Sequence, residues 1–493
     1  MLQQSHKRFI AIVTLLLVVF IAACGGGSGG GGTVASGGIG GTGVTSGTVS
    51  GFGSVFVNGI EFDTDGASRD VDDEIDISNG RDDDTVLGIG MVVTIIGTVN
   101  DDGVTGTAES IEYDDDIEGP VAAAPVEDQD MLSKTFDVFN TTVVVGRDTT
   151  VFEATNYDDL AQNDLLEISG YFDVDGNLLA TRVEREGVLV FGDSEVEIRG
   201  KVSGFDGIDT FLLGGITIIF DGETEFEDLP GTVKDGQFVE VEGILDSATS
   251  IAAGRIERED EDFGDDVDQI SIEGIVTDFN DIGNFKVAGQ RVNASKAAFE
   301  PASLETSIAE GDKVEVEGAI VDGILKAKEV EQRGGDSRVS AIVVSKNNAA
   351  GTVTLQVVLG EPSLTVMTDS QTQIEDERDD EEPFDISGID AGDFLNVEGF
   401  VDGNGNFIAS QIERDEPGDI ELRGPVDVPP TAAGIVSILG ISIATDGSTD
   451  FEDAGDASIS SAVFFGDVEN GELVEFKDEL PADGIADEVE FED

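Results

Sequence analysis

Residues 311–331 read GDKVEVEGAIVDGILKAKEVE, and this stretch decides the fold. Apolar and charged residues alternate over residues 314–317, which predicts a β-strand with one face buried and the other in water. Gly318 ends the alternation. Asp322 and Gly323 then separate two strand-like runs, a strong hairpin signal because a type I′ turn needs positive φ at both central positions. The stretch therefore predicts a β-hairpin.

The hairpin recurs, with drift, six times along the chain. The glycine that ends its first arm is found at Gly97, Gly170, Gly243, Gly318 and Gly399, a spacing of 73 to 81 residues. Such a period indicates tandem copies of one structural unit. The sixth copy departs from the pattern, with Phe476 and Lys477 where the glycine is expected.

The second arm carries an unusual spacing. In all six copies an Ala and the next Ile or Val are three residues apart, as Ala327 and Val330 are. A flat strand would place these two side chains on opposite faces, so we expect either a β-bulge between them or a strand buried on both sides.

Each unit also has a front half of short strand-like runs with Gly-bearing turns, for example residues 47–62 with the turn Asn58–Gly59. Each unit of roughly 75 residues thus holds about five or six short strands. Helical periodicity is scarce, and the best candidate is a short connector at residues 301–309. The fold class we predict is all-β, a tandem array of about six small OB-like β-barrel or sandwich repeats.

The repeats follow a signal peptide and a Gly-rich tether, so the expected organisation has eight parts. These are a lipoprotein signal peptide (1–23), a lipidated Cys with the tether (24–43), and six β repeats (44–117, 118–195, 196–268, 269–335, 336–417 and 418–493).

The N-terminal residues predict export and lipid anchoring. Lys7 and Arg8 precede an apolar run at residues 9–21, the pattern of a secretory signal peptide. The sequence around Cys24 resembles a bacterial lipobox, in which the Cys becomes the lipidated first residue; the alternative is an ordinary signal peptide with an unused Cys. Gly25 follows, which by resemblance to the sorting rule of such lipoproteins implies the outer membrane of a Gram-negative cell, on its periplasmic side or at the cell surface.

The charge is strongly negative, with 105 Asp and Glu against 26 Lys and Arg and a formal net charge of -79. OB-like barrels often bind oligonucleotides, but a surface of this sign repels phosphates and lacks a basic groove, so we expect no nucleic-acid partner. The partners we expect are the membrane, through the N-terminal lipid, and a protein or polysaccharide of the cell envelope. A basic protein or a cation-bridged polysaccharide would suit this field.

Acidic residues between the strands raise the possibility of calcium binding, because hard cations take carboxylate and carbonyl oxygens. Asp173 and Asp175, and in another repeat Asp402, lie in fragments that look like calcium loops, and residues 375–385 form an acidic run. The alternative is structural, since Asp, Asn and Gly are favoured in hairpin turns for backbone reasons, and acidic loops also keep a protein soluble.

Catalysis has little support in the composition. The only His and the only Cys, His6 and Cys24, lie within the N-terminal segment, so Ser–His, Cys–His and the common zinc sites are not available. A glycosidase needs only two carboxylates, but the chain has no Trp and three Tyr (Tyr113, Tyr157 and Tyr171) to hold a sugar ring. We expect no enzyme activity and no catalytic residues, and calcium is the one cofactor considered.

Two motifs carry a resemblance to known domains. The Gly-Asp-x-Val-x-Val-x-Gly pattern of residues 311–318 resembles the third strand of many bacterial OB-like domains. The front of the first repeat, GTVSGFGSVFVNGIEFDT, with its later GMVVTIIG, looks like the bacterial repeat family called domain of unknown function 5666. The resemblance is best for the first repeat, weaker for the third to fifth, and least for the second and sixth. It implies a lipoprotein context and a small β-barrel, and no activity.

These observations favour a non-enzymatic, outer-membrane-anchored lipoprotein that acts as a multi-domain β scaffold or binding module. The alternative is a calcium-binding surface protein or adhesive matrix protein, for which Asp173, Asp175, Asp402 and the run at residues 375–385 would supply the ligands.

Overall fold

In the structure, a computed structural model, the predicted hairpin is present. β25 (Lys313–Val321) pairs antiparallel with β26 (Ile324–Gln332). Asp322 and Gly323 have φ values of 53° and 68°, both positive, as the type I′ turn requires. The apolar face of β25 is buried, with Val314 fully enclosed.

The opposite face of β25 does not lie in water, and that part of the prediction is wrong. Glu315 is only 3% exposed. Its Oε1 accepts a hydrogen bond from Ser271 Oγ at 2.5 Å, and its Oε2 accepts one from Arg333 Nε at 3.1 Å. A buried carboxylate is tolerated when a positive charge and hydrogen bonds replace its water. The alternating charges therefore form a packed polar layer.

The β-bulge that the Ala–Val spacing predicts is confirmed. Glu317 lies opposite Glu329, but Gly318 lies opposite Ala327, so that Lys328 is the extra residue. The extra residue turns the strand, and Ala327 faces the core together with the next Val. The same register shift occurs at Gly97, Gly170, Gly243 and Gly399.

The bulge also explains the glycine. A Cβ on Gly318 would lie 2.3 Å from the carbonyl oxygen of Lys326, closer than any real contact. The sixth repeat, which has no glycine here, has no register shift either, because Phe476 and Lys477 pair directly with Val489 and Glu488. The bulge expected there from the spacing of Ala486 and Val489 is therefore wrong, and the departure noted in the sequence is a real structural difference.

The structure describes residues 41–51, 54–71, 74–76, 87–100, 103–128, 133–147, 149–227, 229, 233–259, 263, 267–334, 337–369, 372–376, 378, 384–401, 405–428, 434–454, 457–469 and 472–492. The predicted signal peptide and most of the predicted tether, with Cys24, lie outside these residues. Residues 37–493 form one compact unit. Within the described part, we find no helix with the length and apolar character needed to cross a membrane.

One repeat closes into a five-stranded barrel, as the first repeat illustrates. Its strand order around the ring is β1 (Gly41–Gly51), β2 (Val55–Val57), β3 (Ile60–Asp63), β7 (Thr105–Tyr113) and β6 (Val92–Val99), and β6 returns to β1. The only parallel pairing in this ring is β3 with β7. The first arm of the hairpin is β6 in this repeat, and it is the fourth of the five barrel strands in chain order. The expectation that this pattern forms a third strand is therefore wrong.

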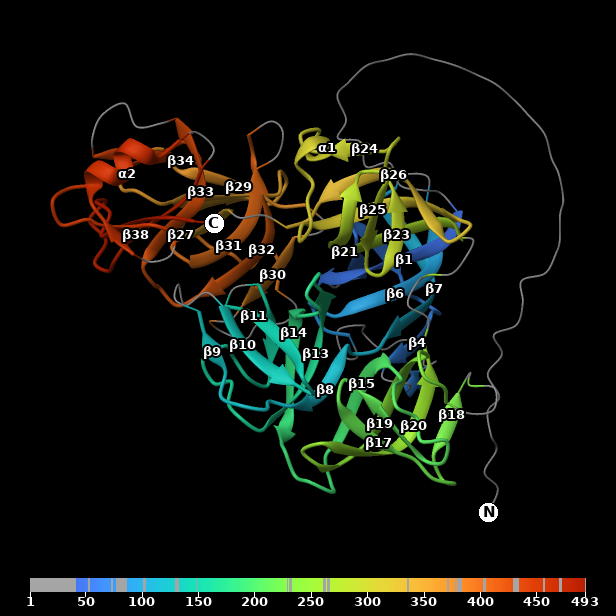
Figure 1. The fold of residues 1–493 in the computed structure, drawn as a ribbon. Coiled ribbons are helices and arrows are strands. Elements are labelled where there is room, and N and C mark those ends of the chain that lie inside the picture. Colours follow the sequence, from blue (N-terminus) through green and yellow to red (C-terminus); the bar gives the residue numbers. More distant parts are fainter. Residues whose placement is uncertain are drawn as a thin grey trace, which may run out of the picture. The chain divides into compact units, whose positions relative to one another are not determined.

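Two repeats share one sheet in every case. The first and fourth repeats form a 13-stranded sheet in which β1 runs parallel to β21, with Val44 opposite Ile270 (Figure 1). Its other strands are β4 (Ser68–Val71), β5 (Glu74–Asp76), β21 (Val267–Asp281), β22 (Asn284–Val287), β23 (Gln290–Asn293), β24 (Ala298–Glu300), β25 and β26. Neighbours in this sheet are therefore far apart in the chain.

The second and third repeats form another 13-stranded sheet, joined by antiparallel pairing of β8 with β15, where Ile117 lies opposite Ile198. The strands are β8 (Ile117–Pro120), β9 (Val126–Glu127), β10 (Ser133–Val138), β11 (Thr141–Gly146), β12 (Val151–Glu153), β13 (Asp164–Phe172), β14 (Leu178–Val188), β15 (Glu195–Lys201), β16 (Thr210–Leu213), β17 (Ile216–Ile219), β18 (Glu225–Glu227), β19 (Phe238–Ser247) and β20 (Ser250–Arg258).

The fifth and sixth repeats form the third sheet through β27 and β33, with Val339 opposite Leu422. The strands are β27 (Ser337–Asn347), β28 (Thr352–Gln356), β29 (Leu364–Met367), β30 (Gln373–Asp376), β31 (Phe394–Val401), β32 (Phe407–Asp415), β33 (Ile420–Val428), β34 (Ile435–Ile438), β35 (Ile441–Ala444), β36 (Asp450–Glu452), β37 (Ser458–Ile459), β38 (Leu473–Asp478) and β39 (Glu488–Phe491).

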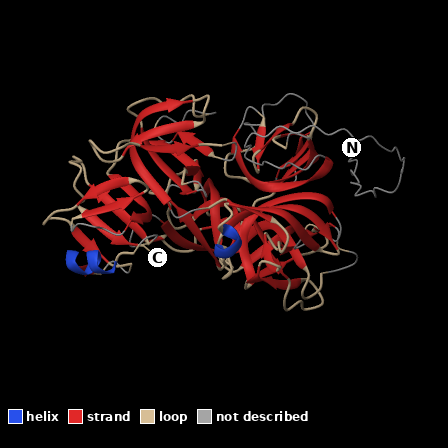
Figure 2. Ribbon diagram, turned by 90° about the horizontal axis from the view of Figure 1, so that it is seen from above, coloured by secondary structure: helices blue, strands red, loops and turns tan. Residues whose placement is uncertain are grey.

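Helix is confined to two short segments in the described residues, as Figure 2 shows. α1 (Leu304–Ser307) lies within the connector predicted at residues 301–309. α2 (Ser461–Asp467) was not predicted; the Ser460 hydroxyl caps it by accepting a hydrogen bond from the Val463 amide at 3.3 Å.

The hydrophobic cores follow the repeats in part. The second and third repeats share one cluster of buried apolar residues, and the fifth and sixth share another. The first and fourth repeats keep separate clusters although their strands belong to one sheet. Strand pairing is therefore the main link between the first and fourth repeats. Polar residues of these two repeats, such as Thr48 and Glu273, contact residues of other repeats.

Candidate functional site

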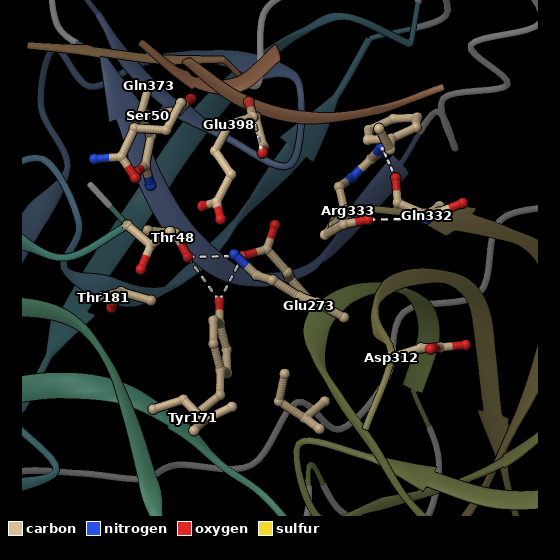
Figure 3. A pocket seen from close by; sticks show the side chains of 18 of the residues that line it. Thr48, Ser50, Tyr171, Thr181, Glu273, Asp312, Gln332, Arg333, Gln373 and Glu398 are labelled. Atoms are coloured by element: carbon tan, nitrogen blue, oxygen red, sulfur yellow. Dashed lines mark hydrogen bonds and ion pairs between the residues drawn. The ribbon is translucent and has the colours of Figure 1, made fainter. Parts of the chain in front are cut away.

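A polar cavity of about 350 Å³ lies where the first, second, fourth and fifth repeats meet (Figure 3). Its walls come from β1 and β21, from the start of β25, and from the bulges of β14 and β32. The lining residues are Thr48, Ser50, Asn58, Thr149, Tyr171, Leu179, Ala180, Thr181, Glu273, Ile275, Gly311, Asp312, Lys313, Gln332, Arg333, Gly334, Asp369, Gln373, Glu398, Phe400, Ile408, Ala409, Ser410 and Gln411.

Three repeats contribute to a hydrogen-bonded group at one side of this cavity. Tyr171 follows the bulge glycine of the second repeat, and its hydroxyl donates to Glu273 Oε1 at 2.8 Å. The hydroxyl of Thr48, on β1, donates to the same oxygen at 2.7 Å and lies 2.9 Å from the Tyr171 hydroxyl. Lys313 completes the group, with Nζ 2.9 Å from Glu273 Oε1. Figure 3 shows Tyr171 and Thr48 both pointing toward Glu273.

This geometry holds Glu273 ionised. Burial alone would raise the pKa of Glu273, but the charge of Lys313 and the hydrogen bonds from Thr48 and Tyr171 outweigh it and leave the pKa below its ordinary value. Burial, together with the negative charge of Glu273, raises the pKa of Tyr171 well above its usual range. At neutral pH the carboxylate is therefore charged and the phenol is protonated.

A second polar group lies around Arg333, which also lines the cavity (Figure 3). Its guanidinium is paired with both Glu315 and Glu331. Burial would lower the pKa of Arg333, but these two carboxylates outweigh burial and raise it. Ser271 extends the group from Glu315 to Asn58, whose Nδ2 donates to the Ser271 hydroxyl at 2.6 Å. The first and fourth repeats are thus joined by side chains as well as by strands.

The bulges contribute side chains to the cavity. The extra residue of the β14 bulge is Thr181, whose hydroxyl donates to the carbonyl of Gly90 in the first repeat at 2.6 Å. The extra residue of the β32 bulge is Ser410, whose hydroxyl donates to the carbonyl of Glu398 at 3.2 Å. In these two repeats the bulge therefore also brings a hydroxyl to the cavity wall, and the hydroxyl of Thr181 reaches a neighbouring repeat.

Two side-chain amides that line the cavity differ from these groups because they make no hydrogen bonds to the described protein. Gln373 on β30 and Gln411 on β32 lie opposite each other in a parallel pairing and are only 9% and 5% exposed. Neither side-chain amide makes a hydrogen bond to any described residue, and each lines the cavity. Neither amide is among the polar atoms that are fully enclosed without a partner, so both amides are accessible from the cavity and keep donors and acceptors open to a bound molecule.

Chemically, this cavity suits binding. A carboxylate that already accepts hydrogen bonds from a Thr and a Tyr and contacts a Lys, and whose pKa is lowered, is a weak base near neutral pH. The hydroxyl of Thr48 donates to Glu273, whose lowered pKa makes it a poor base for activating that hydroxyl. The amides and hydroxyls instead offer donors and acceptors to a bound molecule.

Two of the predicted calcium ligands lie in one hairpin turn of the structure. Asp173 and Asp175 lie in the hairpin turn of the second repeat, where Asp173 Oδ1 accepts hydrogen bonds from the backbone amides of Asp175 and Asn177, each at 2.9 Å. Its Oδ2 accepts one from Asn177 Nδ2 at 2.8 Å. Asp173 thus has the backbone role named as the alternative, and calcium binding there stays a prediction. Asp402 and much of the run at residues 375–385 lie outside the described residues.

Other carboxylates do come together. Among the described residues, three groups each hold three carboxylates whose oxygens all lie within 4.8 Å of one another. They are Glu167 with Glu184 and Glu186, Glu197 with Glu240 and Glu242, and Glu452 with Glu488 and Glu490. None contains a residue proposed from the sequence. The groups arise because Glu residues on adjacent strands face one another across the sheets.

Sequence reasoning missed the cavity. Tyr171 was noted only as one of three tyrosines, and Thr48 and Glu273 were not singled out. These residues are separated by 102 to 225 positions in the chain, so no local pattern marks them as a site. The one sequence signal was the bulge, which places Tyr171 and Thr181 beside the conformational break in their strands.

Comparisons with known proteins agree with the repeat architecture. The sequence profile of the family "Domain of unknown function (DUF5666)" matches residues 118–184, 199–257, 273–331 and 343–413. These ranges include the second repeat, which we expected to depart from the family, and do not include the first, which we expected to fit best. That expectation is wrong, because the profile matches the second repeat and does not extend over the first.

Other comparisons add little. No curated protein matches the chain. Among solved structures, one described as "drosophila Unr CSD456" is 14% identical, with 45% of this chain and 96% of that chain covered and a TM-score of 0.17. So low a TM-score supports no conclusion. The family matches alone span more than half of the 493 residues: this chain belongs to the DUF5666 family, and carries its domain in tandem.

Proposed function

We propose that this protein is a non-enzymatic lipoprotein of the bacterial outer membrane, anchored through Cys24, whose six repeats form a binding scaffold in the cell envelope. The observation that carries the proposal is the pairing of repeats across continuous sheets. Backbone hydrogen bonds join β1 to β21, β8 to β15 and β27 to β33. Repeats joined in this way form larger fixed surfaces than flexibly linked domains do.

The chemistry of the cavity supports a binding role over catalysis. Its central carboxylate, Glu273, already contacts Thr48, Tyr171 and Lys313. The strongly negative chain, at -79, favours a neutral or cationic partner of the envelope over a nucleic acid. The partner class is therefore a protein or polysaccharide that is not itself strongly acidic.

The anchor is tested by metabolic labelling with a palmitate analogue in a Gram-negative host. The full-length protein should incorporate label and fractionate with the outer membrane, while Cys24→Ser should do neither. Since Cys24 is the only Cys of the chain, label that persists in the variant would contradict lipidation at this residue. Globomycin, which blocks lipoprotein signal cleavage, should cause the unprocessed protein to accumulate.

The scaffold function is tested by crosslinking in intact cells, followed by identification of the envelope component that is captured. Capture of the envelope component should require the folded repeats. In a separate assay, the purified protein should leave a panel of hydrolase substrates unchanged. Turnover of any such substrate by the pure protein, lost on substitution of Glu273, would contradict the non-enzymatic role.

A calcium-binding surface or adhesive protein is the second candidate. It is favoured by rows of glutamates that face one another, such as Glu118 opposite both Glu167 and Glu197. Like charges directly opposite in a sheet are destabilising, and a cation would offset them. A thermal melt with millimolar calcium, compared with magnesium and with sodium chloride at equal ionic strength, tests it. A rise specific to calcium supports the candidate, and equal melts remove it.

A further inference from the structure

We propose that the polar cavity between the first, second, fourth and fifth repeats binds a hydroxyl-rich molecule of the size of a monosaccharide, uncharged or with a single positive charge. This inference rests on the proposed function as a binding scaffold, and it names the site and the ligand class. It is carried by two buried amides that have no partner in the described protein, by the size of the cavity and by the charges around it.

The paired amides are the first observation. Gln373 and Gln411 lie opposite each other on adjacent parallel strands, each at least nine-tenths buried, and both line the cavity. Neither side chain has a hydrogen-bond partner among the described residues, and neither amide is fully enclosed, so both are open to the cavity. Each amide offers an acceptor and two donors. Two amides side by side match adjacent hydroxyls of a sugar ring, since each hydroxyl both donates and accepts.

The size of the cavity agrees with this ligand. Its volume of about 350 Å³ is at the lower end of ligand sites. A hexose, with twelve non-hydrogen atoms, is likewise at the small end of the ligands that such sites take. Phe400 and Ile408 add an apolar surface to the wall, against which the C–H face of a sugar ring can pack.

Charge decides which sugars fit. The carboxylates of Glu273, Asp312, Asp369 and Glu398 outnumber the cations of Lys313 and Arg333 around the cavity. Both cations are already engaged, Lys313 by Glu273 and Arg333 by Glu315 and Glu331. An anionic ligand would meet repulsion with no free cation to receive it. Phosphorylated sugars and uronic acids are therefore excluded, and a neutral sugar or an amino sugar is accommodated.

The test is titration of the detergent-solubilised, full-length lipoprotein with three matched probes, glucose, glucosamine and glucuronate, followed by saturation-transfer NMR. Glucose and glucosamine should bind and glucuronate should not. Gln373→Ala and Gln411→Ala should each weaken binding about tenfold, the loss expected for a ligand hydrogen bond. The matched control is Gln162→Ala, an exposed Gln of the second repeat whose Nε2 donates to the Ala122 carbonyl, and it should leave binding unchanged.

A second pair of variants leaves both amides in place. One variant adds a large side chain inside the cavity, and the other adds the same side chain outside it as a control. Ser410 and Lys328 are the extra residues of equivalent bulges, but only Ser410 lines the cavity. Ser410→Leu should abolish sugar binding, whereas Lys328→Leu should not, and melting temperatures report that both fold.

Three outcomes would overturn the inference: no binding of glucose or glucosamine, binding of glucuronate as strong as that of glucose, or binding that neither Gln variant weakens. If sugars fail to bind while Cys24 is still acylated and the envelope partner is still captured, the ligand class is wrong and the scaffold function stands. If acylation and capture fail as well, the proposed function itself is wrong.

Discussion

The hydroxyl of Tyr171 donates a hydrogen bond to Glu273 Oε1 at 2.8 Å, although the two residues lie 102 positions apart and in different repeats. Thr48, from a third repeat, donates to the same oxygen at 2.7 Å. One buried carboxylate thus joins the first, second and fourth repeats.

Tyr171→Phe tests this junction. The variant removes a hydrogen bond to a buried, ionised carboxylate, so we expect the free energy of unfolding to fall by about 1.5–3 kcal/mol. Thr48→Val should cost a similar amount, and the double variant should cost less than the sum because the two hydroxyls share Glu273. The measurement is urea unfolding followed by circular dichroism.

The control for this pair is Thr142→Val, in which the lost hydroxyl donates to Asp137 on an exposed surface. It should change the free energy of unfolding by less than about 0.5 kcal/mol. If Tyr171→Phe unfolds at the same urea concentration as the native chain, the junction does not stabilise the fold.

The bulge glycine is the next test. In Gly318→Ala the new Cβ would lie 2.3 Å from the Lys326 carbonyl oxygen, so we expect a loss of about 2 kcal/mol or more in the free energy of unfolding as the strands separate. Gly466→Ala is the matched control, because this glycine lies in α2 with nothing within 4 Å of the added Cβ. There Ala should stabilise by up to about 1 kcal/mol. If Gly318→Ala and Gly466→Ala had the same melting temperature, the bulge would not require a glycine at residue 318.

Stability should fall as pH rises from about 4.5 to 8. Burial, with the charges of Glu315 and Glu329, raises the pKa of Glu317 to about 8, and burial, with Glu331 and Glu315, raises the pKa of Glu329 to about 7. Burial likewise raises the pKa of Asp114 to about 8. The folded state therefore binds more protons than the unfolded state in this window, and each raised pKa favours the folded state at low pH and loses that effect as pH increases.

Glu317→Gln isolates one of these carboxyls. The variant should match the native chain at pH 5, where the carboxyl is neutral in the folded state, and should melt at a higher temperature than the native chain at pH 8. Glu305→Gln in exposed α1 provides the control and should alter neither melt. Glu273, whose pKa is lowered, acts in the opposite sense and limits the gain below pH 4.5. Equal melts of Glu317→Gln and the native chain at pH 8 would disprove the assignment.

Asp376 lies in the acidic run at residues 375–385 that was considered for calcium, but it is buried and paired with Arg414. Arg414 Nε donates to Asp376 Oδ1 at 2.6 Å. Asp376→Asn should remove the nearest carboxylate from the buried guanidinium, which also has a longer ion pair to Asp393 Oδ2 at 3.9 Å, and should cost about 3 kcal/mol.

Adding calcium distinguishes an ion pair at Asp376 from a calcium site. The loss in Asp376→Asn should be the same with and without millimolar calcium, since the partner of Asp376 is a guanidinium. The double variant Asp376→Leu with Arg414→Met should recover part of the stability, because it removes both buried charges. A calcium-dependent loss would instead place Asp376 in a cation site.

Much of the single repeat could be predicted from its sequence, because its signals are local. Asp322 and Gly323 adopt the positive φ that a type I′ turn needs, and the three-residue spacing of Ala327 and Val330 indicated the bulge. The site could not be predicted in this way. Gln373 and Gln411 became neighbours only through a parallel pairing of strands within their barrel, and nothing in either local sequence marks them as ligand-binding.

The sequence by itself determined the all-β class, the tandem period, the hairpin turns and the positions of the bulges in the first five repeats, since each follows from backbone sterics and from side-chain alternation over a few residues. The tertiary structure alone decided that the first repeat pairs with the fourth while the second pairs with the third. It also decided that Glu315, on a face expected to be wet, is buried against Ser271 and Arg333. Both depend on which barrel surfaces meet, and that choice is a sum of long-range contacts that no single stretch of sequence encodes.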